Sequence, residues 1–457
     1  MDGPADINTN RIIIPEQVRE ESYGEFILLG YNGPPDSANK SRSNGRQHRS
    51  KLSFRVRDQP NGIKKSGVSE TKQNPLHNDA VKDSSKHVVS YLYYKGHAVL
   101  VEYEIDQQKD MFQIGRSSEP QIDFTIVDTW IGASNPGGVL NPIGQHRNQK
   151  AKAITAKGDK QVSSTISRYA CRILADRDEP NKCYVYAAGF DTSRNIFLGE
   201  KATKWQKKNG EFDGLTTNGV LILHPNRNID TENQKEMYTW REVSVDGEIY
   251  TLRETRSSTK RGDLVMEESN QLQDGTLIDL CGATLLWRSA EGLKQSPSTA
   301  ELERRLDELN AGKPQCPVNL NTLIIPRKRT TKSSTNSKQP YVYLRCGHVQ
   351  GKHNWGVTQN GASECAFKCP ICLLESDAIL QLTMGMESAF HLDSDSLDYA
   401  FNPCGHVASK ATVNYWSRIP LPHGTNSFYP VCPFCTTLLD LKKPSVRLIF
   451  QDHCYDT

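Results

Sequence analysis

The sequence predicts a mainly β protein in two parts: a β-sandwich with a long insertion, followed by a smaller zinc-binding domain of mixed α and β structure. Two observations support this fold class. Between residues 88 and 287, short β-branched and aromatic runs recur roughly every ten residues with Gly, Asn and Asp between them, which is typical of β-sandwiches. In the last quarter, cysteine–histidine pairs recur with the spacing of zinc ligands.

Length and composition limit the possible functions. A chain of 457 residues is too long for one ordinary core, so two or three domains are expected. The formal net charge of +3 does not favour nucleic acid or an anionic membrane as a partner. No apolar run approaches the roughly 20 residues of a membrane-spanning helix, and the N-terminus lacks the pattern of a signal peptide. We therefore expect a cytoplasmic protein, with a nuclear location open, no membrane insertion, and nucleic acid unlikely as a partner.

The sandwich is expected over residues 20–289, after an N-terminal tail over residues 1–19, with insertions near 36–87 and 130–160. Its first strand is predicted over residues 25–31, where EFILLGY precedes an Asn-Gly turn. The stretch from Lys40 to Lys65 is rich in Lys and Arg and holds a single acid. We interpret it as a solvated loop, and a nuclear-import or nucleic-acid patch is the alternative.

A helix and a linker are expected between the two parts, over residues 290–340. Residues 298–301 have the sequence Ser-Thr-Ala-Glu, which is a capping box at a helix start. Leu302, Leu306 and Leu309 follow at i, i+4 and i+7, on one face of that helix. The Lys-, Ser- and Thr-rich sequence after it has no apolar pattern and predicts an exposed linker.

The C-terminal domain is expected over residues 341–457, reaching back at most to Cys316. It contains two matching units, each a Cys-Gly-His followed by a Cys-Pro-x-Cys. Thiolates and imidazoles are the donors that zinc binds in a tetrahedron. Four such pairs in a duplicated pattern are a much stronger signal than one Cys-x-x-Cys, so we expect two zinc ions. The predicted ligands are Cys346, His348, Cys369, Cys372, Cys404, His406, Cys432 and Cys435.

The spacing leaves open which pairs of ligands share an ion. In a sequential arrangement each Cys-Gly-His joins the Cys-Pro-x-Cys that follows it, whereas in a cross-braced arrangement the first pair joins the third. Eight ligands for two ions indicate closed, structural sites, because a catalytic zinc needs an open position and a nearby base. Weaker candidates for a ligand are His353, Cys365, His423, His453 and Cys454.

A cysteine–histidine pattern that ends in Cys-Pro-Phe-Cys resembles the RING family of ubiquitin ligases. The resemblance implies a ligase without a covalent intermediate, which holds a ubiquitin-charged conjugating enzyme beside a substrate lysine. The implied contacts with that enzyme are Ile371, inside the first Cys-x-x-Cys, and Pro433 with Phe434, inside the last. The alternative is that Ile371 and Phe434 fill the core of the domain. The ligand order differs from the ordinary RING, in which a Cys-x-x-Cys comes first.

The β-rich region carries a second group of polar residues. A Gly-Arg-Ser sequence ends one strand, a Ser-rich stretch precedes the next, and a Thr-Thr-Asn-Gly sequence comes later. Arg offers a forked cation, Ser and Thr offer hydroxyls, and Asn offers an amide, which are the groups that bind a phosphate. Three such sequences in this order within a β-sandwich resemble the forkhead-associated (FHA) domain, which binds phosphothreonine.

The FHA resemblance implies a role for each residue. Arg116 and Ser167 would hold the phosphate, with help from Thr217 and with Ser117 as a further candidate, while Asn218 would hold the backbone of the partner. In this chain an alanine replaces the His of the family's Ser-x-x-His sequence, a residue that supports the loop. The alternative is an interaction sandwich that does not bind phosphate.

An FHA-type sandwich joined to a RING-like zinc domain resembles the Pellino family over nearly the whole chain. The resemblance is carried by stretches such as YGEFILLGYNG, AAGFDTSRNIFLGEKATKW, DGLTTNGVL, CGHVQGKHNWG and CPFC. It implies a RING-type E3 ubiquitin ligase of Toll and interleukin-1 receptor signalling in innate immunity. The implied partners are a ubiquitin-conjugating enzyme, ubiquitin, and phosphorylated receptor-associated kinases of the Pelle and IRAK class. The alternative is a non-enzymatic, phospho-dependent scaffold for the same kinases.

Overall fold

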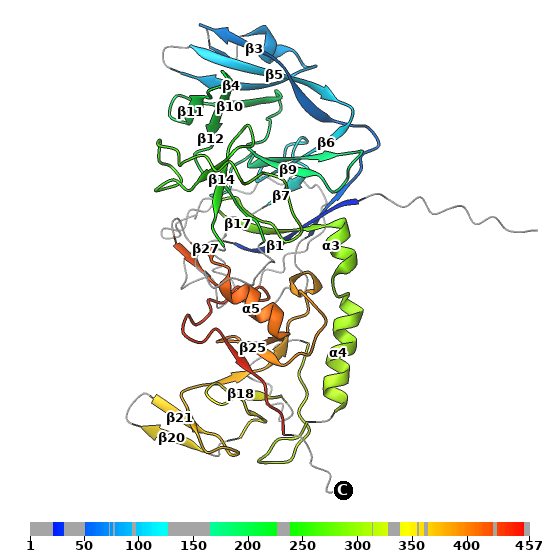
Figure 1. Ribbon diagram of the computed structural model, residues 1–457, viewed down its shortest axis with the longest axis vertical. Coiled ribbons are helices and arrows are strands. Elements are labelled where there is room, and N and C mark those ends of the chain that lie inside the picture. The colour runs from blue at the N-terminus through cyan, green and yellow to red at the C-terminus, as the bar shows by residue number, and fades with distance from the viewer. Residues whose placement is uncertain are drawn as a thin grey trace, which may run out of the picture.

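The chain forms two bodies stacked along its longest axis, seen in a computed structural model (Figure 1). A β-rich N-terminal part lies at the top and a smaller C-terminal part at the bottom, and helices α3 (Ala290–Gln295) and α4 (Thr299–Ala311) run between them. The mainly β prediction is confirmed. The structure describes residues 22–31, 51–72, 74–75, 78–93, 97–126, 165–225, 238–312, 314–327, 339–353, 356–360, 364–423 and 427–451. The tail over residues 1–19 and the insertion near 130–160 lie outside these ranges.

The described residues of the N-terminal part form three sheets and a hairpin. The largest is antiparallel and runs β15 (Ile249–Thr251), β14 (Arg241–Val243), β13 (Val220–Leu223), β16 (Leu277–Asp279), β17 (Ala283–Ser289), β1 (Ser22–Tyr31), β2 (Lys51–Arg55). A second runs β7 (Phe124–Thr125), β6 (Lys109–Gly115), β8 (Cys171–Asp176), β9 (Cys183–Ala187). A third runs β10 (Asn195–Leu198), β4 (His87–Leu92), β5 (Ala98–Asp106), β3 (Gly62–Thr71). The hairpin is β11 (Thr203–Gln206) with β12 (Phe212–Leu215), and the short helix α2 (Asp79–Lys82) precedes β4.

The largest sheet is apolar on both of its faces. Successive residues of a strand point to opposite faces, so Phe26 and Leu28 of β1 enter the core of the sandwich while Ile27 and Leu29 point away from it. The outward residues are buried too, in a second core that they share with the C-terminal part. That outward set is Ile27, Leu29, Leu221, Leu223, Leu277 and Leu286. Because burying each such side chain is worth about 1.5–3 kcal/mol, this face needs a cover.

Part of the basic stretch is folded, which corrects one expectation. We expected a solvated loop from Lys40 to Lys65, but residues 51–55 form β2 and residues 62–65 open β3. The cations of these residues also have acidic neighbours, which weakens the alternative of a nucleic-acid patch. The pairs are Lys51 with Glu25, Arg57 with Asp123, Lys64 with Glu104 and Lys65 with Glu211. Residues 40–50 lie outside the described residues.

The predicted helix is present and packs against the C-terminal part. Ser298 is the N-cap of α4, and its hydroxyl accepts the N–H of Glu301 at 3.0 Å. Leu302 and Leu306 are buried in a third core with residues of the C-terminal part, and Leu309 packs at its edge. The helix is therefore fixed to that part. No helix among the described residues is long and apolar enough to cross a membrane.

Short strands build the C-terminal part. They form the sheets β19 (Val349–Gln350), β18 (Tyr341–Tyr343), β23 (Ile379–Gln381); β20 (Val357–Asn360), β21 (Glu364–Lys368), β22 (Glu375–Ser376); and β24 (Thr383–Met384), β26 (His406–Ala408), β25 (Tyr399–Phe401), β29 (Ser445–Arg447). A hairpin pairs β27 (Leu421–His423) with β28 (Ser427–Tyr429), and the helices are η3 (Ser388–Phe390) and α5 (Lys410–Arg418). The short hairpins bring the cysteines and histidines together.

Candidate metal centres and phosphate site

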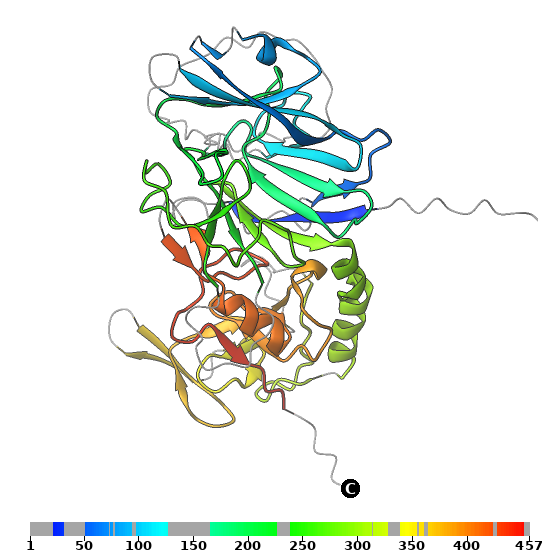
Figure 2. The ribbon, with the colours of Figure 1, turned by 45° about the horizontal axis from the view of Figure 1, so that its top comes forward.

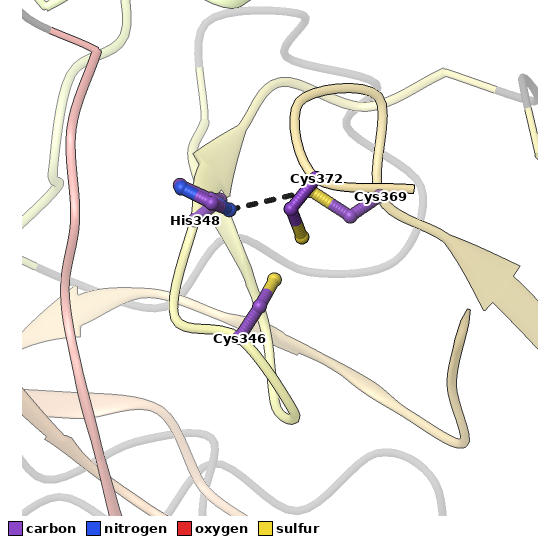
Figure 3. A group of neighbouring side chains, drawn as sticks. All are labelled: Cys346, His348, Cys369 and Cys372. Atoms are coloured by element: carbon purple, nitrogen blue, oxygen red, sulfur yellow. Dashed lines mark hydrogen bonds between the residues drawn. The ribbon is translucent and has the colours of Figure 1, made fainter. Parts of the chain in front are cut away.

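The first cysteine–histidine group forms where two turns meet. Cys346 and His348 lie in the turn between β18 and β19, and Cys369 and Cys372 lie in the turn after β21. Figure 3 shows the four side chains converging, and their ligand atoms all lie within 4.8 Å of one another. His348 Nδ1 is 3.5 Å from Cys369 Sγ. Three thiolates and one imidazole in this arrangement suit a tetrahedral zinc ion.

The second group repeats this construction. Cys404 lies in the turn between β25 and β26, His406 is the first residue of β26, and Cys432 and Cys435 come from the turn after β28. His406 Nδ1 lies 3.4 Å from Cys404 Sγ and 3.7 Å from Cys432 Sγ. All eight predicted ligands therefore fall into two groups suited to two zinc ions, and the pairing is the sequential one. With four protein donors each, the groups are closed and would hold zinc as a structural element.

Both Cys-Pro-x-Cys turns have the same backbone geometry. The N–H of Leu373 donates to the carbonyl of Cys369 at 3.0 Å, and the N–H of Thr436 donates to the carbonyl of Cys432 at 2.8 Å. Leu373 and Thr436 have φ angles of 60° and 59°, in the left-handed region. This tight turn directs both sulfurs of each pair toward the metal position.

Glycine is required in both Cys-Gly-His sequences. Gly347 and Gly405 have φ angles of 83° and 74°. A Cβ on Gly347 would lie 2.3 Å from the carbonyl oxygen of Arg447, and one on Gly405 would lie 2.0 Å from that of Gln381. The chain therefore passes so close to a neighbouring strand that a side chain is excluded between the Cys and the His.

Three loops meet at one end of the sandwich, as expected for a phosphate site. Arg116 lies after β6, where its Nε donates to Ile166 O at 2.8 Å and its backbone N–H donates to Ser167 O at 3.1 Å. Asn218 Nδ2 donates to Ser167 Oγ at 3.1 Å and to Thr165 O at 2.7 Å. These bonds hold the three loops together. Ser117 and Thr217 adjoin them, and the N–H of Ser117 donates to Arg168 O.

The two arginines at this end differ in charge balance. Among the described residues, Arg116 has no carboxylate within ion-pair distance, and its side chain is exposed. Arg168 is ion-paired with Glu119, which also accepts the hydroxyl of Tyr169 at 2.6 Å. Burial, together with this hydrogen bond, raises the pKa of Tyr169 to about 12, so the phenol stays neutral and donates. Arg116 is thus the cation available to an anion.

Comparison with known proteins decides the family. The model of the Pellino FHA domain matches residues 15–305, and that of the Pellino RING domain matches residues 309–455. The chain is 49% identical over 431 residues to "Protein pellino" of Drosophila melanogaster, covering 94% of the chain and 93% of the relative. It is 44% identical over 430 residues to "E3 ubiquitin-protein ligase pellino homolog 2" of Homo sapiens, covering 94% and 95%. The chain belongs to the Pellino family.

The Pellino chain is a RING-type E3 ubiquitin transferase with an FHA domain. The resemblance found in the sequence is therefore confirmed, and an E3 ligase implies a conjugating enzyme and ubiquitin as partners. The alternative of a non-enzymatic scaffold is not supported, because the relatives are ubiquitin ligases. From here the two parts are called the FHA domain and the RING domain.

The three residues predicted to contact the conjugating enzyme do not form one exposed surface in this Pellino chain. Ile371 is 40% exposed, beside the exposed Leu373 and Leu374. Pro433 is buried, and Phe434 is half-buried, with its ring centroid 5.1 Å from that of His391. Phe434 thus packs partly against the core that the two domains share, as the alternative interpretation held for it, and of the three predicted residues Ile371 is the most exposed.

A hydrogen-bond network supports the loops of the predicted phosphate site in the Pellino chain. Arg256 Nη1 donates to Asn218 O at 3.2 Å, and Arg256 forms an ion pair with the fully buried Asp279. Asp279 also accepts the N–H of Cys281 at 3.0 Å, and Thr165 Oγ1 donates to Cys281 O at 2.6 Å. The support therefore comes from the turn between β16 and β17.

Sequence reasoning missed Arg256 and Asp279. Asp279 lies in the run TLIDL, which we interpreted as an ordinary buried strand. An acid in such an apolar run was the available signal, because a buried carboxylate needs a partner. The sequence does not indicate that the partner comes from a loop more than twenty residues earlier.

The Pellino RING domain contains a third turn of the same construction, around Cys316. The N–H of Leu320 donates to Cys316 O at 3.0 Å, the N–H of Cys316 donates to Asn321 O at 2.9 Å, and Leu320 has a φ angle of 54°. Asn319 occupies the position of the second cysteine, and Cys316 is fully buried in the third core. The turn therefore packs in the core, and it joins neither metal group.

Proposed function

We propose that this ligase selects its targets by phosphothreonine on activated receptor-associated kinases of the Pelle and IRAK class, in Toll and interleukin-1 receptor signalling. It would then promote transfer of ubiquitin to them from a conjugating enzyme docked on the RING domain. The observation that carries the proposal is the meeting of Arg116, Ser167 and Asn218 at one end of the FHA domain. That site is part of the same chain as a ubiquitin-ligase domain.

The local chemistry suits a phosphate with close to two negative charges. The Nε of Arg116 is held by Ile166 O, which orients the guanidinium and leaves its two terminal nitrogens for the phosphate oxygens. The hydroxyls of Ser167 and Thr217 add neutral donors. Both N–H groups of the Asn218 amide bond within the site, so its Oδ1 is the atom that would accept a backbone N–H of the partner.

A binding experiment tests the targeting half of this proposal. The full chain is mixed with an autophosphorylated kinase of this class, and with the same kinase after phosphatase treatment. We expect binding to the phosphorylated form and its loss after treatment. Equal binding to both forms would show that recognition does not depend on phosphate.

The conjugating enzyme is proposed to dock on the first Cys-Pro-x-Cys turn. We expect Ile371→Ala to lower the rate of ubiquitin discharge from the charged enzyme to free lysine by about tenfold, because hot-spot side chains carry most of a docking energy. Zinc content and melting temperature should stay near those of the wild type, since Ile371 is partly exposed. Leu441→Ala is the matched control, because Leu441 is a 72% exposed leucine elsewhere on the RING domain. Equal discharge rates for Ile371→Ala and Leu441→Ala would show that the conjugating enzyme docks at another site.

The network behind the phosphate loops gives a separate prediction. Asp279→Asn leaves the guanidinium of Arg256 without its counter-charge. We therefore expect the protein to be destabilised, with a free energy of unfolding about 3 kcal/mol lower. Binding of a phosphothreonine peptide should weaken as well, because Arg256 holds the loop of Asn218. Thermal unfolding and peptide titration measure the two effects. Asp263→Asn, an exposed acid of the same domain, is the control and should change neither quantity.

A further inference from the structure

The FHA and RING domains share a continuous buried interface. The outward face of the seven-stranded sheet packs on α5, on η3 and on the hairpin of β27 and β28 in one hydrophobic core. Figures 1 and 2 both show the orange helix α5 close below the sheet that contains the blue strand β1. Trp240 of the FHA domain and Trp416 of the RING domain are 3% and 1% exposed. The interface is therefore built like the interior of a single domain.

Polar contacts fix the orientation across this interface. Trp240 Nε1 donates to Pro420 O at 2.6 Å. Arg288, which is 6% exposed, donates through Nη1 to Ala389 O at 2.7 Å. At the rim, Lys51 Nζ lies 3.3 Å from Glu387 Oε1. The first two bonds satisfy polar groups that are buried in the interface, whereas the Lys51–Glu387 pair lies at the exposed rim.

The interface also reaches the second metal group. Gly30 of β1 lies against Thr436, the residue that follows the zinc ligand Cys435. A Cβ on Gly30 would lie 2.7 Å from Thr436 Cγ2. The second Cys-Pro-x-Cys turn, with the buried Pro433, is thus on the covered side of the RING domain, whereas Ile371 is on an open turn.

The apolar outward face argues against separation of the two domains. Its side chains, Ile27, Leu29, Leu221, Leu223, Leu277 and Leu286, are each 3% exposed or less. Separation would expose all of them together with Trp240, a patch of a kind that soluble monomers rarely show. A transient contact is usually more polar than this. The apolar composition of this face therefore favours a permanent interface between the two domains over one that opens and closes.

We propose that the FHA and RING domains act as one rigid body, with Trp240 and Arg288 as positioning residues for ubiquitin transfer. This inference rests on the proposed function. In the transfer, a target lysine amine attacks the thioester carbonyl, the C–S bond breaks as the isopeptide bond forms, and the conjugating enzyme's cysteine leaves with the proton that the amine gives up. The rate depends on proximity and orientation. A fixed union places a phosphate-docked target at one position relative to the charged enzyme, and so selects which lysine reacts.

A disulfide across the interface tests the rigid union. In Gly30→Cys with Thr436→Cys, the new Cβ lies 3.6 Å from the Cβ at position 436, within the range of disulfides. We expect the oxidised, locked protein to modify a phosphorylated target within about twofold of the rate of the reduced protein. A loss of about tenfold or more on oxidation, reversed by reduction, would mean that the domains must separate and would overturn the proposal.

Loosening the interface tests the positioning role. Trp240→Ala should leave phosphothreonine-peptide affinity and discharge to free lysine within about twofold of wild type, yet lower transfer to the docked target about tenfold and spread it over more lysines. Trp240→Phe keeps an aromatic ring in the core but loses the bond to Pro420 O, so its transfer rate and lysine pattern should lie between those of the wild type and of Trp240→Ala. If hydrogen exchange in β1 and α5 shows a loosened interface while the rate and lysine pattern stay unchanged, the interface does not position the target.

Controls separate this inference from the proposed function. The two single-cysteine variants and a zinc analysis show whether a thiol beside Cys435 disturbs the metal group. If the reduced parent fails to prefer a phosphorylated target, the proposed function fails whatever the disulfide does. If the preference is present and only the locked form loses transfer, the rigid union alone is wrong.

Discussion

The double change Cys369→Ser with Cys372→Ser is expected to abolish ubiquitin transfer and to leave one zinc ion per chain. It removes two of the four ligands of the first group, at a kind of site whose metal binding is worth on the order of 10 kcal/mol. The turn that presents Ile371 is formed by these cysteines, so its conformation should be lost with the metal. Metal analysis, discharge to free lysine and hydrogen exchange measure the three consequences.

The control for this variant is Cys281→Ala, a half-buried cysteine outside both metal groups. It should keep two zinc ions and normal discharge to free lysine. Phosphothreonine binding should also persist in the double serine variant, because the phosphate site lies in the other domain. Normal transfer with the first zinc absent would contradict the role of that group in presenting the docking turn.

Arg116→Ala is expected to weaken binding of a phosphothreonine peptide by roughly 10- to 150-fold. The variant removes a charge-assisted hydrogen bond worth about 1.5–3 kcal/mol, and Arg116 is the arginine of this site without a described carboxylate partner. The side chain is exposed, so folding stability should change little. Arg116→Lys keeps the positive charge but loses the forked guanidinium and its bond to Ile166 O. Its peptide affinity should lie between that of the wild type and that of Arg116→Ala.

Arg168→Ala is the matched control for Arg116→Ala. Arg168 lies on a neighbouring loop of the site, but its charge is already paired with Glu119. Its removal should change peptide affinity by no more than about threefold. Equal losses in the two variants would mean that the site acts through its overall positive field and that Arg116 has no special part. Binding should also weaken as the pH falls through about 6, where the phosphate takes up a proton.

The metal ligands could be predicted from the sequence because spacing alone brings a Cys-Pro-x-Cys pair together. The sequence could not show which Cys-Gly-His joins which Cys-Pro-x-Cys, because that depends on which hairpins lie side by side. For the same reason the burial of Pro433 and Phe434 could not be predicted, because it depends on what packs against the second Cys-Pro-x-Cys turn. In the structure, Gly30 of the FHA domain lies against Thr436 in that turn.

The interface between the domains left a partial signal in the sequence. The run FILL in β1 is apolar at every position, which indicates a strand buried on both faces. It does not say what covers the second face. The strands β2 and β3 left less signal, because their surface positions carry Lys and Ser, residues that favour loops in the absence of the cross-strand acids found in the structure.

The most direct test of the two-part account is the ratio of ubiquitin transfer rates to a phosphorylated and to a dephosphorylated target, measured for the wild type and for Arg116→Ala. We expect this ratio to be about ten or more for the wild type. For Arg116→Ala it should be near one, because the variant has lost the affinity for phosphate that Arg116 provides. Discharge to free lysine should be the same for both proteins. An unchanged ratio in Arg116→Ala would contradict the claim that the FHA domain chooses the target by its phosphate.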